Sequence, residues 1–190
     1  EHLSINFGSR QLLDDVNFYL NEGDKVGVIG INGTGKSTFL KVLSGVTEPD
    51  GGTISRNPNV QVSLLPQNPV MEESATVLEQ VFLHFPAEFR ELNEYEAKAM
   101  LNRLGITDFA QKVGTLSGGQ RKRVALAAAL IPPADVLILD EPTNHLDSEM
   151  VAWLEDWLRR FKGGLVMVTH DRYFLERGVN HITELSRGKL

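Results

Sequence analysis

Short apolar runs separated by residues that favour turns dominate the first third of the chain. Each run has the length of a strand and is rich in β-branched and aromatic residues. Turn-forming pairs such as Gly8-Ser9 lie between them, which indicates a hairpin-like start. The predicted strands cover residues 3–7, 16–20, 25–29, a short segment between Gly52 and Asn57, and 61–65.

From about residue 76 to 104 the apolar period changes from strand to helix. Ala97, Leu101 and Leu104 recur at helical spacing, and Gly105 follows as a stop signal. We therefore predict a small helical subdomain over about residues 72–130.

The remainder of the chain alternates between helix and strand. Helices are predicted at 117–130 and 148–160, and apolar strands at 136–139 and 165–168. This alternation indicates a parallel sheet, and strands that are apolar at successive positions indicate helices on both of its faces. The fold class predicted is α/β, with an antiparallel β part at the beginning of the chain.

The composition limits the classes of function that need to be considered. The chain has 190 residues, 42% of them hydrophobic and 23% charged, no cysteine, and a net charge of −6. Disulfides and thiolate metal sites are excluded, and a cytoplasmic location is expected. No apolar run approaches the roughly 20 residues that span a bilayer, so we expect no membrane insertion. The acidic balance gives no general attraction to nucleic acid. A start without Met and an end at Gly188-Lys189-Leu190 suggest an excised part of a longer polypeptide.

A glycine-rich segment follows directly on the strand predicted at 25–29. Residues 30–37 read Gly-Ile-Asn-Gly-Thr-Gly-Lys-Ser, which fits the P-loop pattern. Phe39, Leu40 and Leu43 then share one face of a helix that Gly45 can end. Strand, glycine-rich loop and helix in this order are the context that the pattern requires.

Each residue type in this loop suits the binding of a nucleoside triphosphate. Glycines let successive N–H groups turn towards the phosphates, and the start of the helix adds positive potential. Lys36 is expected to reach the outer phosphates, and the hydroxyl of Ser37 to bind Mg²⁺. The structural alternative is a glycine-rich turn capped by Ser37. The predicted nucleotide-binding residues are Gly30, Ile31, Asn32, Gly33, Thr34, Gly35, Lys36, Ser37 and Thr38.

Two carboxylates end the buried strand predicted at 136–139. Asp140 is the candidate ligand of Mg²⁺, as at the same place in other P-loop folds. Glu141, one residue further on, is placed to orient or deprotonate the water that attacks the γ-phosphate, a task that needs a proton acceptor. The structural alternative is a pair of acidic residues that end a strand in solvent.

The segment Leu116, Ser117, Gly118, Gly119 and Gln120 begins the helix predicted at 117–130. Ser117 and Gln120 have the spacing of a capping box, in which each side chain binds the other residue's backbone N–H. Such a helix start also directs free N–H groups and the positive end of the helix dipole outward, so it can bind an anion. The structural and the functional interpretations are compatible. Four residues are predicted to form the buried stripe of this helix, namely Val124, Ala127, Ala128 and Ile131.

Together these motifs make the whole chain resemble an ABC-type ATPase. The P-loop, Gln67 after a strand, the LSGGQ signature, Asp140-Glu141 and His170 stand in the family's order. The resemblance implies ATP and Mg²⁺ as ligands, and a second ABC domain that sandwiches two ATP molecules head to tail. The signature then serves the ATP bound to the partner domain.

The resemblance also implies roles that the residues alone do not establish. Gln67 would join the Mg²⁺ and water shell, although a Gln after a strand is otherwise a surface residue. His170 would contact the γ-phosphate as the switch histidine, although a single His is more often structural. Phe7 would stack on adenine, or else belong to the core.

Three local agreements indicate the ABC-F subgroup, whose members hold two ABC domains and no transmembrane partner. They are the sequences Glu-Pro-Thr-Asn-His-Leu-Asp at 141–147, Trp-Leu-Glu at 153–155 and Thr-His-Asp-Arg-Tyr-Phe-Leu at 169–175. This resemblance implies an ATPase domain, the first of two, that acts with the ribosome and tRNA and is weakly active in isolation. The segment between Gln67 and Ser117 is too short for the α-helical arm usual in such domains, so the arm is deleted, disordered or lacking.

Other functions remain open at this point. The main alternative is the ATP-binding subunit of a membrane transporter, with its helical region docked on a permease. An ABC module of the DNA-repair type would need long coiled coils, and no sustained heptads occur. A simple kinase would leave the signature unexplained.

Overall fold

A computed structural model describes residues 2–6, 17–21, 25–29, 53–55, 61–169, 174 and 181–184, with side chains at 25–27, 61–169 and 174. The chain divides into two compact units. The first unit comprises residues 1–67, 134–142 and 157–190, and the second comprises 68–133 and 143–156.

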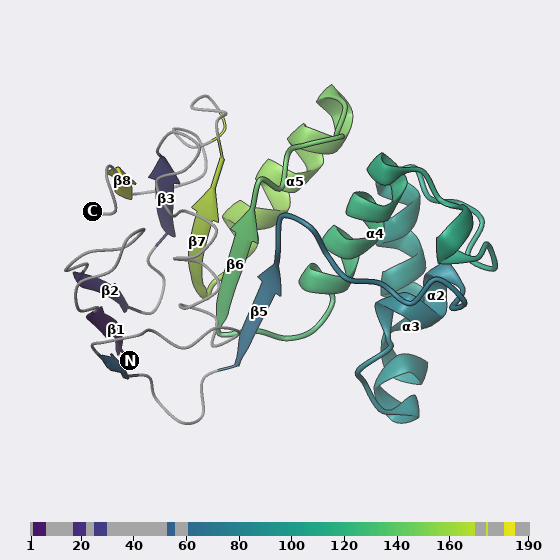
Figure 1. Ribbon diagram of the computed structural model, residues 1–190, viewed down its shortest axis with the longest axis horizontal. Coiled ribbons are helices and arrows are strands. Elements are labelled where there is room, and N and C mark those ends of the chain that lie inside the picture. Colours follow the sequence, from purple (N-terminus) through teal and green to yellow (C-terminus); the bar gives the residue numbers. More distant parts are fainter. Residues whose placement is uncertain are drawn as a thin grey trace. The chain divides into compact units, whose positions relative to one another are not determined.

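The first unit contains a three-stranded antiparallel sheet near the beginning of the chain (Figure 1). Its strands are β1 (His2–Asn6), β2 (Asn17–Asn21) and β4 (Thr53–Ser55), in the order β2-β1-β4. β1 is antiparallel to both neighbours, with Ile5 opposite Phe18 on one side and Ile54 on the other. The predicted antiparallel pairing at the start of the chain is confirmed.

The first unit also contains the predicted parallel sheet, in the strand order β5-β6-β7-β3-β8. Every neighbouring pair in it is parallel. All residues of β6 and β7 are buried, which explains their unbroken apolar sequences. The strands are β3 (Lys25–Ile29), β5 (Val62–Leu65), β6 (Val136–Asp140), β7 (Gly164–Val168) and β8 (His181–Glu184).

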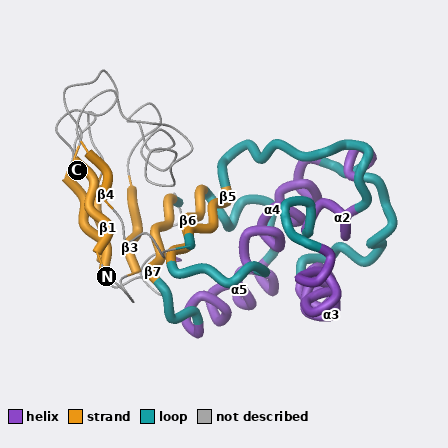
Figure 2. The backbone as a smooth tube through the Cα atoms, turned by 90° about the horizontal axis from the view of Figure 1, so that it is seen from below, coloured by secondary structure: helices purple, strands orange, loops and turns teal. Residues whose placement is uncertain are grey.

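Helices make up most of the second unit, and Figure 2 shows them in purple. Ala97, Leu101 and Leu104, predicted at helical spacing, are fully buried. The predicted subdomain of about 72–130 lies within this unit, which also includes residues 143–156. The helices described are α2 (Val77–Val81), α3 (Ala87–Arg103), α4 (Gly118–Leu130) and α5 (Ser148–Arg160), of which the last four residues belong to the first unit.

The structure differs from the sequence-based elements at two places. The helical stretch expected from about residue 76 to 104 is interrupted between α2 and α3, and Pro86 is the N-cap of α3. A proline disfavours helical geometry in the preceding residue, here Phe85, so the chain must leave the helix there. β8 was not predicted, because its four residues His-Ile-Thr-Glu contain no apolar run.

Several helix ends are stabilised by specific hydrogen bonds. Thr76 and Glu79 form a capping box at α2. At the C-terminal end of α5, the carbonyl oxygens of Leu158 and Arg159 accept hydrogen bonds from Lys25 Nζ, at 2.6 Å and 3.3 Å. Partial burial lowers the pKa of Lys25. This lysine joins the first residue of β3 to the C-terminal end of α5.

Candidate functional site

The carboxyl ends of four parallel strands reach one edge of the five-stranded sheet. In the register, Leu65 of β5 pairs with Leu139 of β6, while Val168 of β7 pairs with both Asp140 and Val28. In open α/β sheets, ligands bind in the crevice outside this edge. The residues that follow these strands are therefore brought towards one site by the topology alone.

Four of the residues predicted for the site follow those strand ends within two positions. Gly30 comes directly after β3, Gln67 two residues after β5, Glu141 directly after β6, and His170 two residues after β7. Of these, Gln67 and Glu141 are among the residues that the structure describes, and Gln67 is exposed. Phe7, the phosphate loop from 30 to 38, the helix face of Phe39, Leu40 and Leu43, Gly45, and His170 lie outside the described residues.

The two carboxylates at the end of β6 are both buried. Asp140 is 6% exposed and Glu141 is 8% exposed. Their burial contradicts the alternative of two acidic residues that end a strand in solvent.

Glu141 has an unusual backbone conformation. Its φ is +51°, in the left-handed region that a residue with a side chain rarely adopts. The N–H of Glu141 donates to Val168 O at 2.7 Å, so β7 holds the turn. Strain of this kind costs about 1–3 kcal/mol and is concentrated at functional sites. The turn directs the chain out of the line of β6 immediately after Asp140.

The chemistry of these donors fits Mg²⁺ bound together with nucleotide phosphates. Mg²⁺ takes one or two carboxylates and completes its shell with phosphate oxygens and water. Among the described residues, no group of three or more His, Cys, Asp or Glu side chains is arranged to hold a metal by itself. Asp140, with the hydroxyl of Ser37 and the amide of Gln67, supplies oxygen donors of the required kind.

The signature segment lies in the second unit, at the start of α4. The predicted capping box is confirmed: Ser117 Oγ accepts from Gln120 N at 3.1 Å, and Gln120 Oε1 accepts from Ser117 N at 2.9 Å. Leu116 is buried, whereas Ser117 and Gly118 are exposed. The helix start is therefore anchored by Leu116 and open to a ligand at the next two residues.

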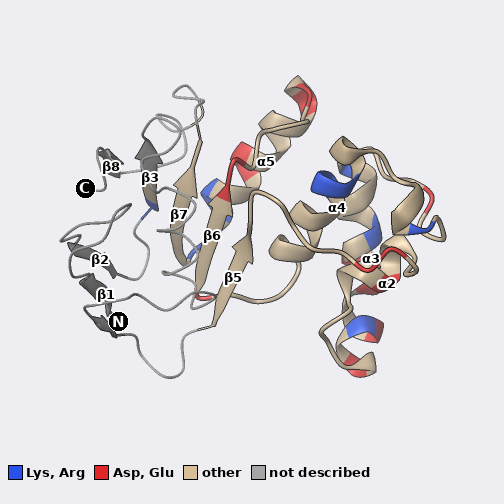
Figure 3. Cartoon of the chain, viewed as in Figure 1, with Lys and Arg blue, Asp and Glu red and all other residues tan. Residues whose placement is uncertain are grey.

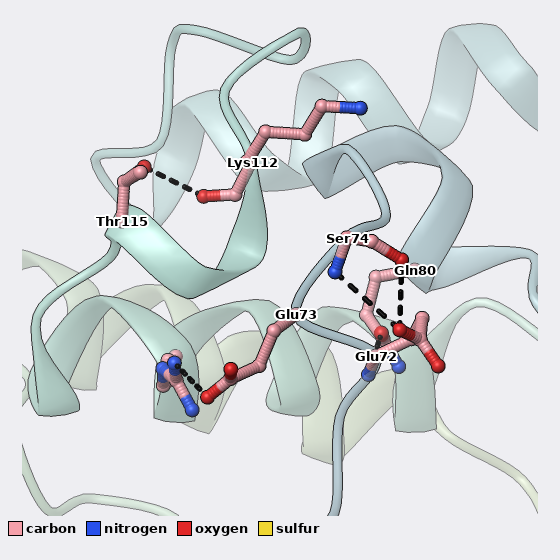
Figure 4. A network of polar contacts seen from close by, with 7 residues as sticks. Glu72, Glu73, Ser74, Gln80, Lys112 and Thr115 are labelled. Atoms are coloured by element: carbon pink, nitrogen blue, oxygen red, sulfur yellow. Dashed lines mark hydrogen bonds and ion pairs between the residues drawn. The ribbon is translucent and has the colours of Figure 1, made fainter.

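The segment before the signature is held against the loop that precedes α2 (Figure 4). Glu73 O accepts from Gly114 N at 3.0 Å, and the carboxylate of Glu73 lies 3.2 Å from Arg121 Nη2. Thr115 Oγ1 donates to Lys112 O at 2.7 Å. The blue segments of α4 in Figure 3 mark the basic residues of this helix.

The buried stripe predicted for α4 is correct in part. Val124 and Ala127 are fully buried, while Ala128 and Ile131 are half-buried. Other residues of α4 are buried as well, namely Ala125, Leu126, Ala129 and Leu130. More of the helix surface is covered than a single stripe accounts for.

Sequence reasoning assigned no role to His145, which the structure places beside the signature. A Cβ atom at Gly119 would lie 3.4 Å from His145 Cβ and Nδ1. His145 has a φ of +65°, and Leu146 N donates to Thr143 O at 3.2 Å to close the turn. The pair Asn144-His145 carried a local signal, since both residue types are enriched at positive φ. Asp147 then caps α5 by accepting from Met150 N at 2.9 Å.

The comparisons with known proteins identify the family of this chain. Residues 13–144 match a protein-family model described as "ABC transporter". The chain belongs to this family. It is therefore an ABC ATPase domain, an enzyme that hydrolyses ATP with Mg²⁺ as cofactor. No helix in the described part of the chain is long and apolar enough to cross a membrane.

Curated relatives cover nearly the whole chain. It is 41% identical over 227 residues to the uncharacterized ABC transporter ATP-binding protein YfmR of Bacillus subtilis, covering 100% of the chain and 36% of the relative. It is 36% identical over 220 residues to the energy-dependent translational throttle protein EttA of Haemophilus influenzae, covering 95% and 39%. The chain thus spans well under half the length of these relatives.

Solved structures show the same fold. The ATP-binding subunit of an ABC transporter is matched with a TM-score of 0.86 at 24% identity, over 100% of this chain and 88% of the other. The dimeric bacterial ABC transporter cassette MJ0796 is matched with a TM-score of 0.81 at 24% identity, over 99% and 96%. The predicted fold class, a P-loop core of ABC type, is confirmed.

Proposed function

We propose that this domain is the first ATPase domain of an ABC-F protein and that its ATP cycle acts on translation at the ribosome. The observation that carries the proposal is the 36% identity to EttA, a relative described as an energy-dependent translational throttle. The sequence at 141–147, which resembles that of the ABC-F subgroup, also supports the proposal. A cytoplasmic location follows from this role.

The proposed reaction begins with ATP in the phosphate loop, where Lys36 holds the outer phosphates and Phe7 stacks on adenine. Ser37, Asp140 and Gln67 would hold Mg²⁺, which would supply positive charge to offset that of the phosphates. Glu141 orients a water molecule and accepts its proton as the water oxygen attacks the γ-phosphorus. His170 contacts the γ-phosphate. The bond to the bridging oxygen breaks, and ADP and phosphate are released.

The signature is proposed to act on the ATP of a partner ABC domain, in the same full-length chain or in a second copy. The capped start of α4 leaves Ser117 and Gly118 exposed, and the N–H groups of this turn suit a γ-phosphate. Two domains would then enclose two ATP molecules head to tail. A single domain contacts the γ-phosphate from one side only, so it should bind ATP weakly and hydrolyse it slowly.

The alignments support the proposal that this chain lacks a segment present in its relatives. The alignment with YfmR covers all 190 residues of this chain but is 227 positions long. The difference, about 37 positions, corresponds to residues of YfmR that have no counterpart here. We place the missing segment between Gln67 and Ser117, where an arm is expected. The arm would be the part that reads tRNA and ribosomal RNA.

Sedimentation of the full-length protein tests this function. Glu141→Gln, with the matching change in the second ABC domain, should trap the closed state, and the protein should migrate with ribosomes through a sucrose gradient when ATP is present. The same protein with ADP is the control and should stay near the top. Recovery in the membrane pellet instead would favour the ATP-binding subunit of a transporter.

A further inference from the structure

The guanidinium of Arg123 connects the first turn of the signature helix to the end of another helix. Arg123 Nε donates to Gly119 O at 3.3 Å, within α4. Arg123 Nη1 donates to Leu104 O at 3.0 Å, at the C-cap of α3. The two carbonyl oxygens belong to helices separated by 14 residues of chain, the interval between Leu104 and Gly118.

Gly105 leaves the space that this guanidinium needs. It has a φ of +76°, and a Cβ atom placed there would lie 3.0 Å from both Arg123 Nη1 and Met150 Cε. Glycine thus permits the left-handed turn that ends α3 and also the close approach of Arg123 and of α5. We call Arg123 together with Leu104, Gly105 and Gly119 the arginine bracket.

The bracket fixes the part of α4 that carries the signature. The carbonyl of Gly119 is bound by Arg123, and the side of Gly119 that lacks a Cβ faces the ring of His145. Ser117 and Gln120 lock the same turn by their capping box. A guanidinium has donors in a fixed planar fork, so it can join two carbonyls at a set distance, which an ammonium on a flexible stem cannot reproduce.

We propose that Arg123 is a positioning residue for the ATPase reaction: it orients the start of α4 so that the signature N–H groups meet the γ-phosphate in the partner site. This rests on the proposed head-to-tail arrangement of two domains. In this proposal Arg123 acts through the carbonyls of Gly119 and Leu104 that it binds. Substitution of Arg123 should therefore have an effect only in states in which the signature has closed on ATP. In those states, a small displacement of the signature N–H groups from the γ-phosphate is costly.

The test uses the full-length protein with Glu141→Gln and the matching change in its second domain, so that ATP is trapped. Addition of Arg123→Lys should speed the release of labelled ATP by about tenfold or more, the equivalent of losing one hydrogen bond to a charged group. The affinity for ADP, which has no γ-phosphate, should stay within about twofold of the parent by the same reasoning. Arg123→Met, which keeps most of the volume, should act in the same direction.

Arg121→Met is the matched control, because Arg121 lies on the same helix in an exposed ion pair with Glu73. Exposed ion pairs of this kind contribute little to the stability of a protein. ATP release should be unchanged in this variant. Equal release from Arg123→Lys and the parent would overturn the proposal, as would an equal loss of ADP and ATP affinity, which would indicate a general loss of structure.

A measurement without nucleotide separates this proposal from the proposed function. In the nuclear magnetic resonance spectrum of the wild-type protein, the Nε proton of Arg123 should exchange slowly, and Arg123→Lys should shift the amide signals of Gly105 and Gly119 while leaving the Gly163 signal in place. If the parent fails to trap ATP, the two-domain arrangement is wrong, and these signals alone decide whether the bracket exists. An unprotected Nε proton would refute it.

Discussion

His145 faces the Cα of Gly119: its Cβ and Nδ1 both lie 3.4 Å from the position that a Cβ of Gly119 would take. His145 lies four residues after Glu141, in the loop that leaves the candidate catalytic carboxylate. Gly119 belongs to the signature, proposed to act on the opposite nucleotide. One short loop therefore carries both the candidate base and a residue that faces the signature.

Substitution of His145 should separate the effect of its backbone conformation from that of its ring. His145→Val should destabilise the protein by about 1–2 kcal/mol, because a β-branched residue is strained at a φ of +65°. His145→Asn should cost less, since Asn tolerates the left-handed region. Urea unfolding of both variants measures the difference, and equal stability of the two would show that the turn relaxes.

Glu141→Gln should remove turnover and keep nucleotide binding. The amide retains the size of the side chain but cannot accept the proton of the attacking water, so phosphate release should fall by about 10²–10⁴-fold. The binding of a fluorescent ATP analogue should change little. Glu149→Gln, at an exposed position in the first turn of α5, is the control. Unchanged turnover in Glu141→Gln would refute the assignment.

Gly163→Ala should destabilise the first unit. A Cβ atom there would lie 2.5 Å from the carbonyl oxygen of Asp135 and 2.7 Å from Phe161 Cζ, so the backbone at the start of β7 must shift. The expected cost is about 1–3 kcal/mol. Gly118→Ala serves as the stability control, because a Cβ at Gly118 meets nothing within 4 Å. Thermal unfolding of both variants provides the comparison.

The capping box of α2 should make a pH-dependent contribution to stability. Hydrogen bonds from the backbone and side chain of Thr76 lower the pKa of Glu79 from its ordinary value of 4.5. The unfolded state then binds a proton more readily, so this contribution is present above the unfolded pKa and is lost as the pH falls through the lowered folded pKa. The melting temperatures of wild type and Glu79→Gln should differ at neutral pH and converge at acid pH. A constant difference would contradict this account.

Local signals in the sequence were enough for features whose partners are close in the chain. The capping box of Ser117 and Gln120 spans three residues, and β6 and α5 follow from their own periodicity. The acidic pair at the end of β6 was assigned from the chemistry of strand ends in P-loop folds, and the roles of both residues stay predictions. The burial of both carboxylates agrees with that reasoning.

Features that depend on distant partners could not be predicted in the same way. Arg123 appears in the sequence as one of three consecutive basic residues, and only the end of α3 reveals its role. The position of His145 beside Gly119 depends on how the signature is folded. β8 has too little apolar character to be recognised before β3 is known to be its neighbour.

The place of β3 in the sheet has a consequence for how the domain is made. Residues 25–29 pair with β7 and β8, which end at residues 168 and 184. Synthesis proceeds at about 5–20 residues per second, so on the order of ten seconds pass between the synthesis of β3, with the phosphate loop that follows it, and that of either partner strand. During that time both edges of the strand are open to other chains. A chain that stops before residue 164 would carry the nucleotide-binding motif on a strand with no sheet to join.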